Sequence, residues 1–269
     1  MEGSCGLYYR NFGGSDNYLA FVETESKKMI RELKRILSNK IYWLIILGGL
    51  SFRGVLMYND RKYRTDMFFA SCSDFWKYIG SLTQAIVILY SVIYIFSYDR
   101  EKGASPVICS TRNGRLSLFL ARLSGGAVAV CISTVLMALV NVIMSQIFGE
   151  GLIVTQWIPS FVLKSLIAAG GALGLYITSA CICDVSQNHT FTMAVCAVPY
   201  LLGYLRGLSG DAIHDEFGLW WFLRYEFFTD FMRGQTISSR PLFWTGWYTA
   251  LILGMLFLAL YKRKMRYEL

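Results

Sequence analysis

Ionisable residues are scarce in this chain of 269 residues, because charged side chains make up 16% of it and hydrophobic residues 55%. A soluble globular protein carries more charge, so this composition favours a protein that lies largely in lipid. Proline occurs only four times, and there is no long polar or Gly/Ser-rich tract. The chain therefore offers no composition break between domains, and we expect residues 1–269 to form a single membrane domain.

The dipeptide Gly-Lys is absent from the whole sequence. A phosphate-binding loop has the form Gly-x4-Gly-Lys-Ser/Thr, in which the lysine reaches the phosphates of the nucleotide. The chain therefore lacks the motif with which most ATPases hold ATP. We expect no nucleotide cofactor in the chain and no ATPase activity of its own.

Histidine is also rare, with only His189 and His214. The stretch 207–210, which contains Ser209, resembles the serine motif of rhomboid proteases, and these enzymes pair that serine with a histidine on a later spanning helix. The last apolar stretch of this chain contains no histidine. A turn is therefore favoured over a nucleophile at Ser209.

The seven cysteines are an odd number, and most lie inside apolar stretches, where a thiol behaves as a small hydrophobic group. No disulfide framework is implied. Cys181 and Cys183, with Asp184 and His189 nearby, are ligand types for a metal, but their spacing matches no zinc ribbon. We expect helix packing here and no metal site.

Six apolar stretches are about as long as a helix that crosses a bilayer. They are residues 41–57, 75–98, 116–148, 161–183, 190–208 and 242–261. The sequence therefore predicts an all-α integral membrane protein with six transmembrane helices over residues 41–261. The third stretch exceeds one crossing, and we expect its excess near Arg122. Arg53 and Lys164 lie near the expected outer ends of their helices, where long side chains can snorkel to the interface.

Lysine and arginine concentrate on one side of this topology. Residues 10–40, 100–122 and 262–266 hold 7, 5 and 4 of them, which is 16 of the 26 in the chain. The positive-inside rule then places residues 1–40 and the tail 262–269 in the cytoplasm, with the six spans in a bacterial cytoplasmic membrane. Because the basic residues flank apolar stretches instead of forming one patch, we expect no nucleic-acid partner despite the net charge of +8.

Residues 25–40 have apolar side chains at helical spacing, which predicts an amphipathic helix at the membrane interface. The basic residues on its remaining face are Lys27, Lys28, Arg31, Lys34 and Arg35. Such a face can anchor to anionic membrane lipid or contact a protein partner. Residues 210–240 are too polar to span but rich in aromatic residues, which predicts short helices at the outer interface before Pro241 begins the last span.

A charged segment separates the second and third apolar stretches. It reads Asp99-Arg100-Glu101-Lys102-Gly103 and continues through Ser110-Thr111-Arg112 to Arg115. An acidic-basic-Glu-basic-Gly cluster after the second span, and a Ser/Thr-Arg step before the third, resemble the permeases of type-2 ABC exporters. The N-terminal helix, the six spans and the aromatic segment before the last span are also similar to that family's layout. One departure is Ala104, where the family often has threonine.

The resemblance implies that this segment is a coupling helix on a separate ABC ATPase. Asp99, Arg100, Glu101, Lys102 and Gly103 would form the coupling element, and Arg112 and Arg115 would contact the ATPase or anionic headgroups. The N-terminal helix would brace the same contact. The partners implied are two ATPase subunits, which would hold ATP and Mg, and a second copy of the chain or a related permease.

Other interpretations remain open at this stage. The charged segment is also what any multispan protein needs in order to set its topology. An intramembrane enzyme and a non-ATP carrier or scaffold are alternatives to the exporter. The substrate class, whether an antimicrobial peptide, a drug or a lipid, is not distinguished by the sequence, because apolar pathway residues look the same as packing residues.

Overall fold

The computed structural model describes residues 15–63, 68–101, 114–149, 157–186, 188–209, 232–234, 250 and 252–261. Within these ranges all regular structure is helical and no strand occurs, which confirms the all-α prediction. The elements are α1 (Ser15–Leu37), α2 (Lys40–Tyr63), α3 (Phe68–Ser73), the 3-10 helix η2 (Phe75–Lys77), α4 (Ile79–Glu101), α6 (Gly114–Gly149), α7 (Ile158–Ser186) and α8 (His189–Ser209).

Four helices are long and apolar enough to cross a membrane, namely α2, α4, α6 and α7. They coincide with the first four predicted spans, and the multi-pass membrane character is thereby confirmed. The fifth predicted span is the helix α8, whose apolar part covers His189–Leu202. Of the sixth, the structure describes the helical stretch Ile252–Tyr261 and residue 250.

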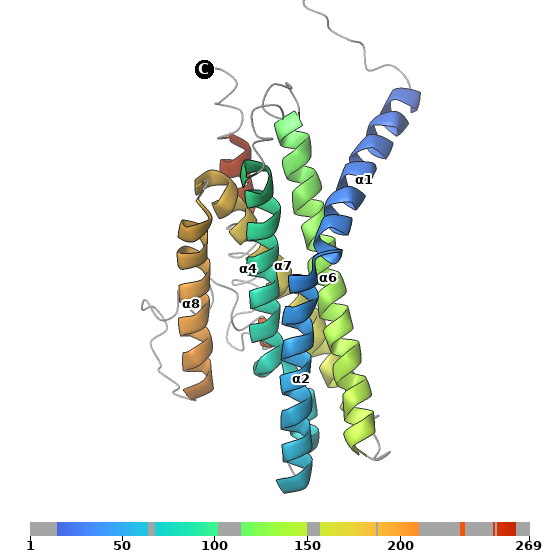
Figure 1. Cartoon of the computed structure of the whole chain (residues 1–269), viewed down its shortest axis with the longest axis vertical. Coiled ribbons are helices and arrows are strands. Elements are labelled where there is room, and N and C mark those ends of the chain that lie inside the picture. Colours follow the sequence, from blue (N-terminus) through green and yellow to red (C-terminus); the bar gives the residue numbers. More distant parts are fainter. Residues whose placement is uncertain are drawn as a thin grey trace, which may run out of the picture.

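The consecutive helices α2, α4, α6, α7 and α8 alternate in direction and form one bundle (Figure 1). We call the end of the bundle at which α1 lies the α1 end, and the opposite end, where η2 lies, the η2 end. Helices α4 and α7 are more enclosed than α2 and α6, and in α4 the side chains of Val87, Ile88, Val92 and Ile95 are fully buried. Helices α2 and α6 each expose one apolar face, as expected of spans that meet lipid.

Asparagines begin two of the helices. The side-chain oxygen of Asn39 accepts a hydrogen bond from the backbone N–H of Ile41 at 2.9 Å, which separates α1 from α2 within two residues. The side-chain oxygen of Asn188 accepts one from the backbone N–H of Phe191 at 3.2 Å, where α8 begins. Both bonds satisfy donors that a helix start leaves unpaired, so each turn is encoded locally.

The N-terminal helix is longer than predicted, because it begins at Ser15 instead of near residue 25. It leaves the start of α2 obliquely and crosses α6 (Figure 1). The crossing is close because Gly125 of α6 has no side chain. A Cβ there would lie 3.0 Å from the carbonyl oxygen of Met29 and 3.2 Å from the nitrogen of Leu33.

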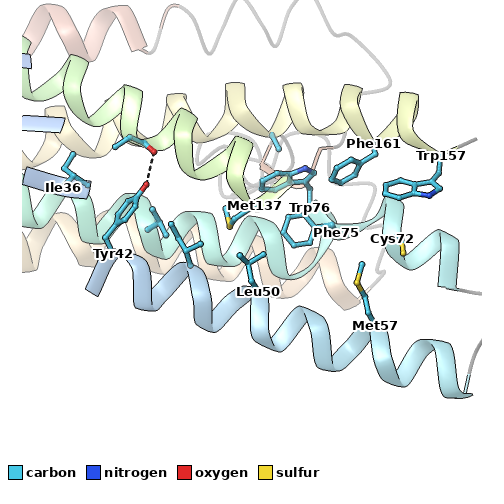
Figure 2. Close-up of a cluster of buried hydrophobic side chains, with 14 of the residues drawn as sticks. Ile36, Tyr42, Leu50, Met57, Cys72, Phe75, Trp76, Met137, Trp157 and Phe161 are labelled. Carbon is cyan, nitrogen blue, oxygen red and sulfur yellow. Dashed lines mark hydrogen bonds between the residues drawn. The ribbon is translucent and has the colours of Figure 1, made fainter. Parts of the chain in front are cut away.

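One cluster of buried apolar side chains follows α2 from Ile36 and Tyr42 to Trp157 and Phe161 at the η2 end (Figure 2). Phe75 and Trp76 lie at its centre and meet edge to face, with ring centroids 4.9 Å apart. Trp157 and Phe161 at the start of α7 form a similar pair at 5.3 Å. These aromatic pairs join η2 to α7 and fix the position of the break between α3 and α4.

Candidate functional site

The predicted coupling residues flank a segment that lies outside the described residues. Asp99, Arg100 and Glu101 belong to the last turn of α4, and Arg115 is the second residue of α6. Lys102, Gly103 and Arg112 fall outside the described ranges. The helix ends that carry the segment both lie at the α1 end of the bundle (Figure 1). The contacts expected of these residues stay predictions.

The five basic residues predicted for the interfacial helix divide into two groups. Lys28 donates to the hydroxyl oxygen of Ser117 on α6 at 2.6 Å, and Arg35 forms an ion pair with Glu32 one turn away at 3.0 Å. The other three, Lys27, Arg31 and Lys34, are exposed. They follow the spacing i, i+4 and i+7, so they share one face of α1. This exposed basic face points away from the side of α1 that packs on the bundle.

The packed side of α1 contains a buried carboxylate. Glu32 is 5% exposed and Ile36 is 1% exposed, and both lie on the side of α1 that meets α6. The ion pair with Arg35 stabilises Glu32, because a carboxylate that loses water needs a partner. The helical spacing assigned Arg35 to the exposed basic face. In the structure its guanidinium instead neutralises the buried Glu32 carboxylate between α1 and α6.

Arg122 lies buried where α4, α6 and α7 meet near the α1 end. Its guanidinium carbon is 5.8 Å from the ring centroid of Phe96, and its backbone carbonyl accepts a hydrogen bond from the Tyr176 hydroxyl at 2.8 Å. The ring of Tyr176 fills the space above Gly126. Helix α6 is one continuous helix of 36 residues, which is longer than one crossing requires, and the position of its excess near Arg122 stays a prediction.

Arg53 is the main polar residue whose role the sequence analysis missed. It is 3% exposed, and its Nε donates to the side-chain oxygen of Asn141 on α6 at 3.2 Å. The amide nitrogen of Asn141 in turn donates to the backbone carbonyl of Cys72 on α3 at 3.2 Å. The snorkelling interpretation is wrong, because α2 continues for ten more residues to Tyr63 and places Arg53 inside the bundle.

A signal for this cluster was present in the sequence. An arginine and an asparagine within apolar stretches are expensive in lipid and mark interior or functional positions. What the sequence could not supply was the pairing of α2 with α6. Burial beside this cluster raises the pKa of the Cys72 thiol to about 11, although the Arg53 guanidinium acts in the opposite direction.

Lys164 also has a protein partner. Its amine lies 2.6 Å from the carboxylate of Asp74, which immediately precedes η2, and this ion pair is about one-third exposed. The snorkelling interpretation is therefore replaced by an ion pair between α7 and the break at η2. The pair lies beside Gly234, whose positive φ of 69° lets the backbone turn against Lys164.

The residues considered for a catalytic site or a metal site do not lie close together in the described part of the chain. His189 and Ser209 are the first and last residues of α8, which places them about 30 Å apart along one helix. His214 lies outside the described residues. Cys181 and Cys183 are buried among apolar side chains. In the described part of the chain, no three His, Cys, Asp or Glu side chains lie together as metal ligands would.

In comparisons with known proteins, no family model, curated protein or solved structure matches this chain.

Proposed function

We propose that this chain is the six-span permease subunit of an ATP-driven exporter in a bacterial cytoplasmic membrane, and that a separate ABC subunit hydrolyses the ATP. The observation that supports this proposal most directly is the arrangement of helices at the α1 end. There α4 and α6 bring the two sides of the charged 99–115 segment together, and α1 crosses α6 with its three exposed cations on the outward side.

Helix lengths support this arrangement. Helix α6 has 36 residues, which corresponds to about 54 Å, whereas the hydrocarbon core of a bilayer is about 30 Å thick. Part of α6 must therefore extend beyond the hydrocarbon. If the extension lies at its first turns, the charged segment stands clear of the lipid and is accessible to a soluble subunit. The crossing of α1 at Gly125 braces this projecting part.

The basic face of α1 suits a protein partner better than lipid alone. Lys27 and Lys34 are seven residues apart, about 10 Å along the helix axis, and α1 leaves the bundle obliquely (Figure 1). The headgroup layer on each side of a bilayer is only about 5–8 Å thick. A helix that leaves the bundle in this way carries its first cations past that layer, where an acidic protein surface can meet them.

The remaining two spans complete the proposal. Helix α8 has 21 residues, about 31 Å, and it runs antiparallel to α7. The stretch Ile252–Tyr261 lies at the same end as α1 (Figure 1). Six crossings return the chain to its starting side, so both termini would be cytoplasmic. The functional unit would contain two ATPase subunits with ATP and Mg, and a second permease.

One observation favours a different class of transporter. The buried cluster of Arg53 and Asn141 lies within the bundle, where carriers driven by ions or by substrate gradients place binding groups. Such a carrier needs no ATPase. The two functions are therefore separated by ATP hydrolysis and not by transport itself.

The test is ATP hydrolysis by the complex isolated from native membranes through a tag on this chain. We expect Mg-dependent hydrolysis to accompany the unaltered chain, and the Glu101→Ala/Arg112→Ala variant to lose coupling between substrate and hydrolysis. Lys62→Ala is the matched control, since Lys62 is an exposed cation at the opposite end of α2. A complex that exports substrate without any hydrolysis would contradict the proposal and favour the carrier.

A further inference from the structure

The backbone between α3 and α4 is the one described break within the η2 end of the bundle. The chain leaves the α-helix at Asp74 and resumes it at Ile79, with the three residues of η2 between them. Irregular backbone at membrane depth is stable only where the protein satisfies its polar groups. The side chains that donate hydrogen bonds to the backbone carbonyls in and beside this break therefore show which elements stabilise it.

Five carbonyl oxygens in residues 72–81 accept hydrogen bonds from side chains of other elements. The donor and acceptor pairs are Asn141 to Cys72 at 3.2 Å, Lys164 to Ser73 at 3.5 Å, Arg233 to Lys77 at 3.1 Å, Tyr204 to Tyr78 at 2.7 Å and Tyr200 to Ser81 at 3.0 Å. The donors come from α6, α7, α8 and the segment 232–234. The break is thus the point at which these elements are joined.

The attachment to α7 is extensive. Phe75 and Trp76 are 2% and 1% exposed, and the indole nitrogen of Trp76 donates to the hydroxyl of Ser165 at 2.8 Å. The ion pair of Asp74 with Lys164 adds a further link. Removing η2 from α7 would expose two large aromatic side chains at once, so we regard this contact as fixed.

The attachment to α8 is of a different kind. It consists of two tyrosines one turn apart, Tyr200 and Tyr204, which are 2% and 6% exposed, stack at 6.4 Å and donate their hydroxyl hydrogens to the carbonyls of Ser81 and Tyr78. Because each tyrosine ring ends in a hydroxyl group that water can satisfy, and a neutral hydrogen bond contributes only about 1 kcal/mol net, exposing these two rings costs less than exposing Phe75 and Trp76. Helix α8 also lies at the edge of the bundle, beside α4 (Figure 1).

A hinge precedes these two tyrosines. Pro199 lies inside α8 immediately before Tyr200. Proline has no backbone N–H, so the carbonyl of Val195 loses its helical donor and the helix can bend at this point. The half of α8 that carries both tyrosines can therefore change direction relative to the half that begins at His189.

We propose that the half of α8 after Pro199 is a movable gate at the η2 end. The gate is closed by hydrogen bonds from Tyr200 to Ser81 and from Tyr204 to Tyr78, and it opens by bending at Pro199. That its opening releases substrate on the far side of the membrane rests on the proposed function. The hinge and the two tyrosine links do not depend on it.

The test measures distances between spin labels in the full-length protein in lipid nanodiscs, without ATP or any partner. Leu205→Cys on α8 and Leu163→Cys on α7 form the reporting pair, and both positions are more than half exposed. Phe191→Cys with Leu120→Cys reports on the other half of α8, again from exposed positions. Cys5, Cys109 and Cys131 are replaced by serine to prevent background labelling.

We expect Tyr200→Phe/Tyr204→Phe to increase the population of longer distances in the reporting pair by about fivefold or more, the factor for loss of one hydrogen bond. The second pair should not change. Adding Pro199→Ala should return the reporting pair to its original distribution. Tyr176→Phe is the matched control, because it also removes a hydroxyl that donates to a backbone carbonyl, and it should change neither pair.

Two outcomes would overturn the gate. The first is a reporting pair that behaves the same in the double phenylalanine variant and in the Tyr176→Phe control. The second is a lengthening of both pairs together, which would mean that α8 leaves as a whole and that Pro199 is no hinge. Should the double variant fold poorly, Tyr204→Phe alone gives the same comparison. Because no nucleotide is present, failure here is distinct from failure of the ATPase proposal.

Discussion

The ring of Tyr176 on α7 occupies the space that a Cβ atom on Gly126 of α6 would need. The same tyrosine donates its hydroxyl hydrogen to the carbonyl oxygen of Arg122 at 2.8 Å. Glycine at position 126 therefore allows α6 and α7 to approach each other and also places the hydrogen bond. This contact joins α7 to the first half of α6, which follows the charged segment.

Replacing Gly126 with alanine should destabilise the protein by about 2–3 kcal/mol, because the new methyl group must displace Tyr176 and break its hydrogen bond. Thermal unfolding followed by tryptophan fluorescence measures the change. Gly170→Ala is the control, since nothing lies within 4 Å of a Cβ at that position. Equal melting temperatures for the two variants would show that α6 and α7 do not pack in this way.

The cluster of Arg53 and Asn141 should respond unequally to loss of either partner. Asn141→Leu leaves a buried guanidinium without its amide acceptor and should cost about 3 kcal/mol or more. Arg53→Met removes the charge together with its need for a partner and should cost less, about 1 kcal/mol. Denaturant unfolding of the two variants and of the double variant gives the order. The reverse order would place Arg53 outside the bundle interior.

Sequence reasoning located the first four spans, because a bilayer imposes a length and a polarity that apolar stretches reveal directly. It located helix contacts poorly. Gly170 of α7 has nothing within 4 Å of a Cβ, whereas the adjacent Gly171 and Ala172 are buried. The close approaches occur at Gly125 and Gly126, because the rotation of each helix about its axis decides which small residues meet a neighbour.

The polar contacts were beyond the sequence for a related reason. Arg53 and Asn141 are 88 residues apart in the sequence, so no local pattern pairs them. Lys28 and Arg35 were grouped with the other cations of α1 because spacing alone does not reveal that Ser117 and Glu32 engage them. Pairing between distant helices determines these roles, and no local pattern encodes it.

The thiol of Cys72 should resist alkylation at neutral pH. Burial raises its pKa to about 11, and only the thiolate reacts, so at pH 8 about one molecule in a thousand is reactive at equilibrium. The labelling rate should rise about tenfold per pH unit between pH 8 and pH 10. Mass spectrometry of the peptide that contains Cys72 measures the rate. A plateau already near pH 9, as for an ordinary cysteine, would contradict the burial of Cys72 against α6.

The two groups of basic residues on α1 should separate in function. Lys27→Gln/Arg31→Gln/Lys34→Gln removes only exposed charges, so stability should change by less than about 0.5 kcal/mol while the yield of co-isolated ATPase falls. Lys28→Gln should do the opposite, lowering stability by about 1 kcal/mol through loss of the bond to Ser117 and retaining the ATPase. If the triple variant keeps its full ATPase yield, the exposed face has no part in docking.

The central claim is that the segment between α4 and α6 faces an ATPase, and photo-crosslinking tests it most directly. A photoreactive amino acid replaces Arg112 in one variant of the chain. In a second variant it replaces Lys62, in the last turn of α2. After illumination in native membranes, the crosslinked polypeptides are identified by peptide sequencing. The account predicts that position 112 captures a polypeptide with a phosphate-binding loop and that position 62 does not. Capture of such a polypeptide from position 62, or of lipid alone from position 112, would contradict it.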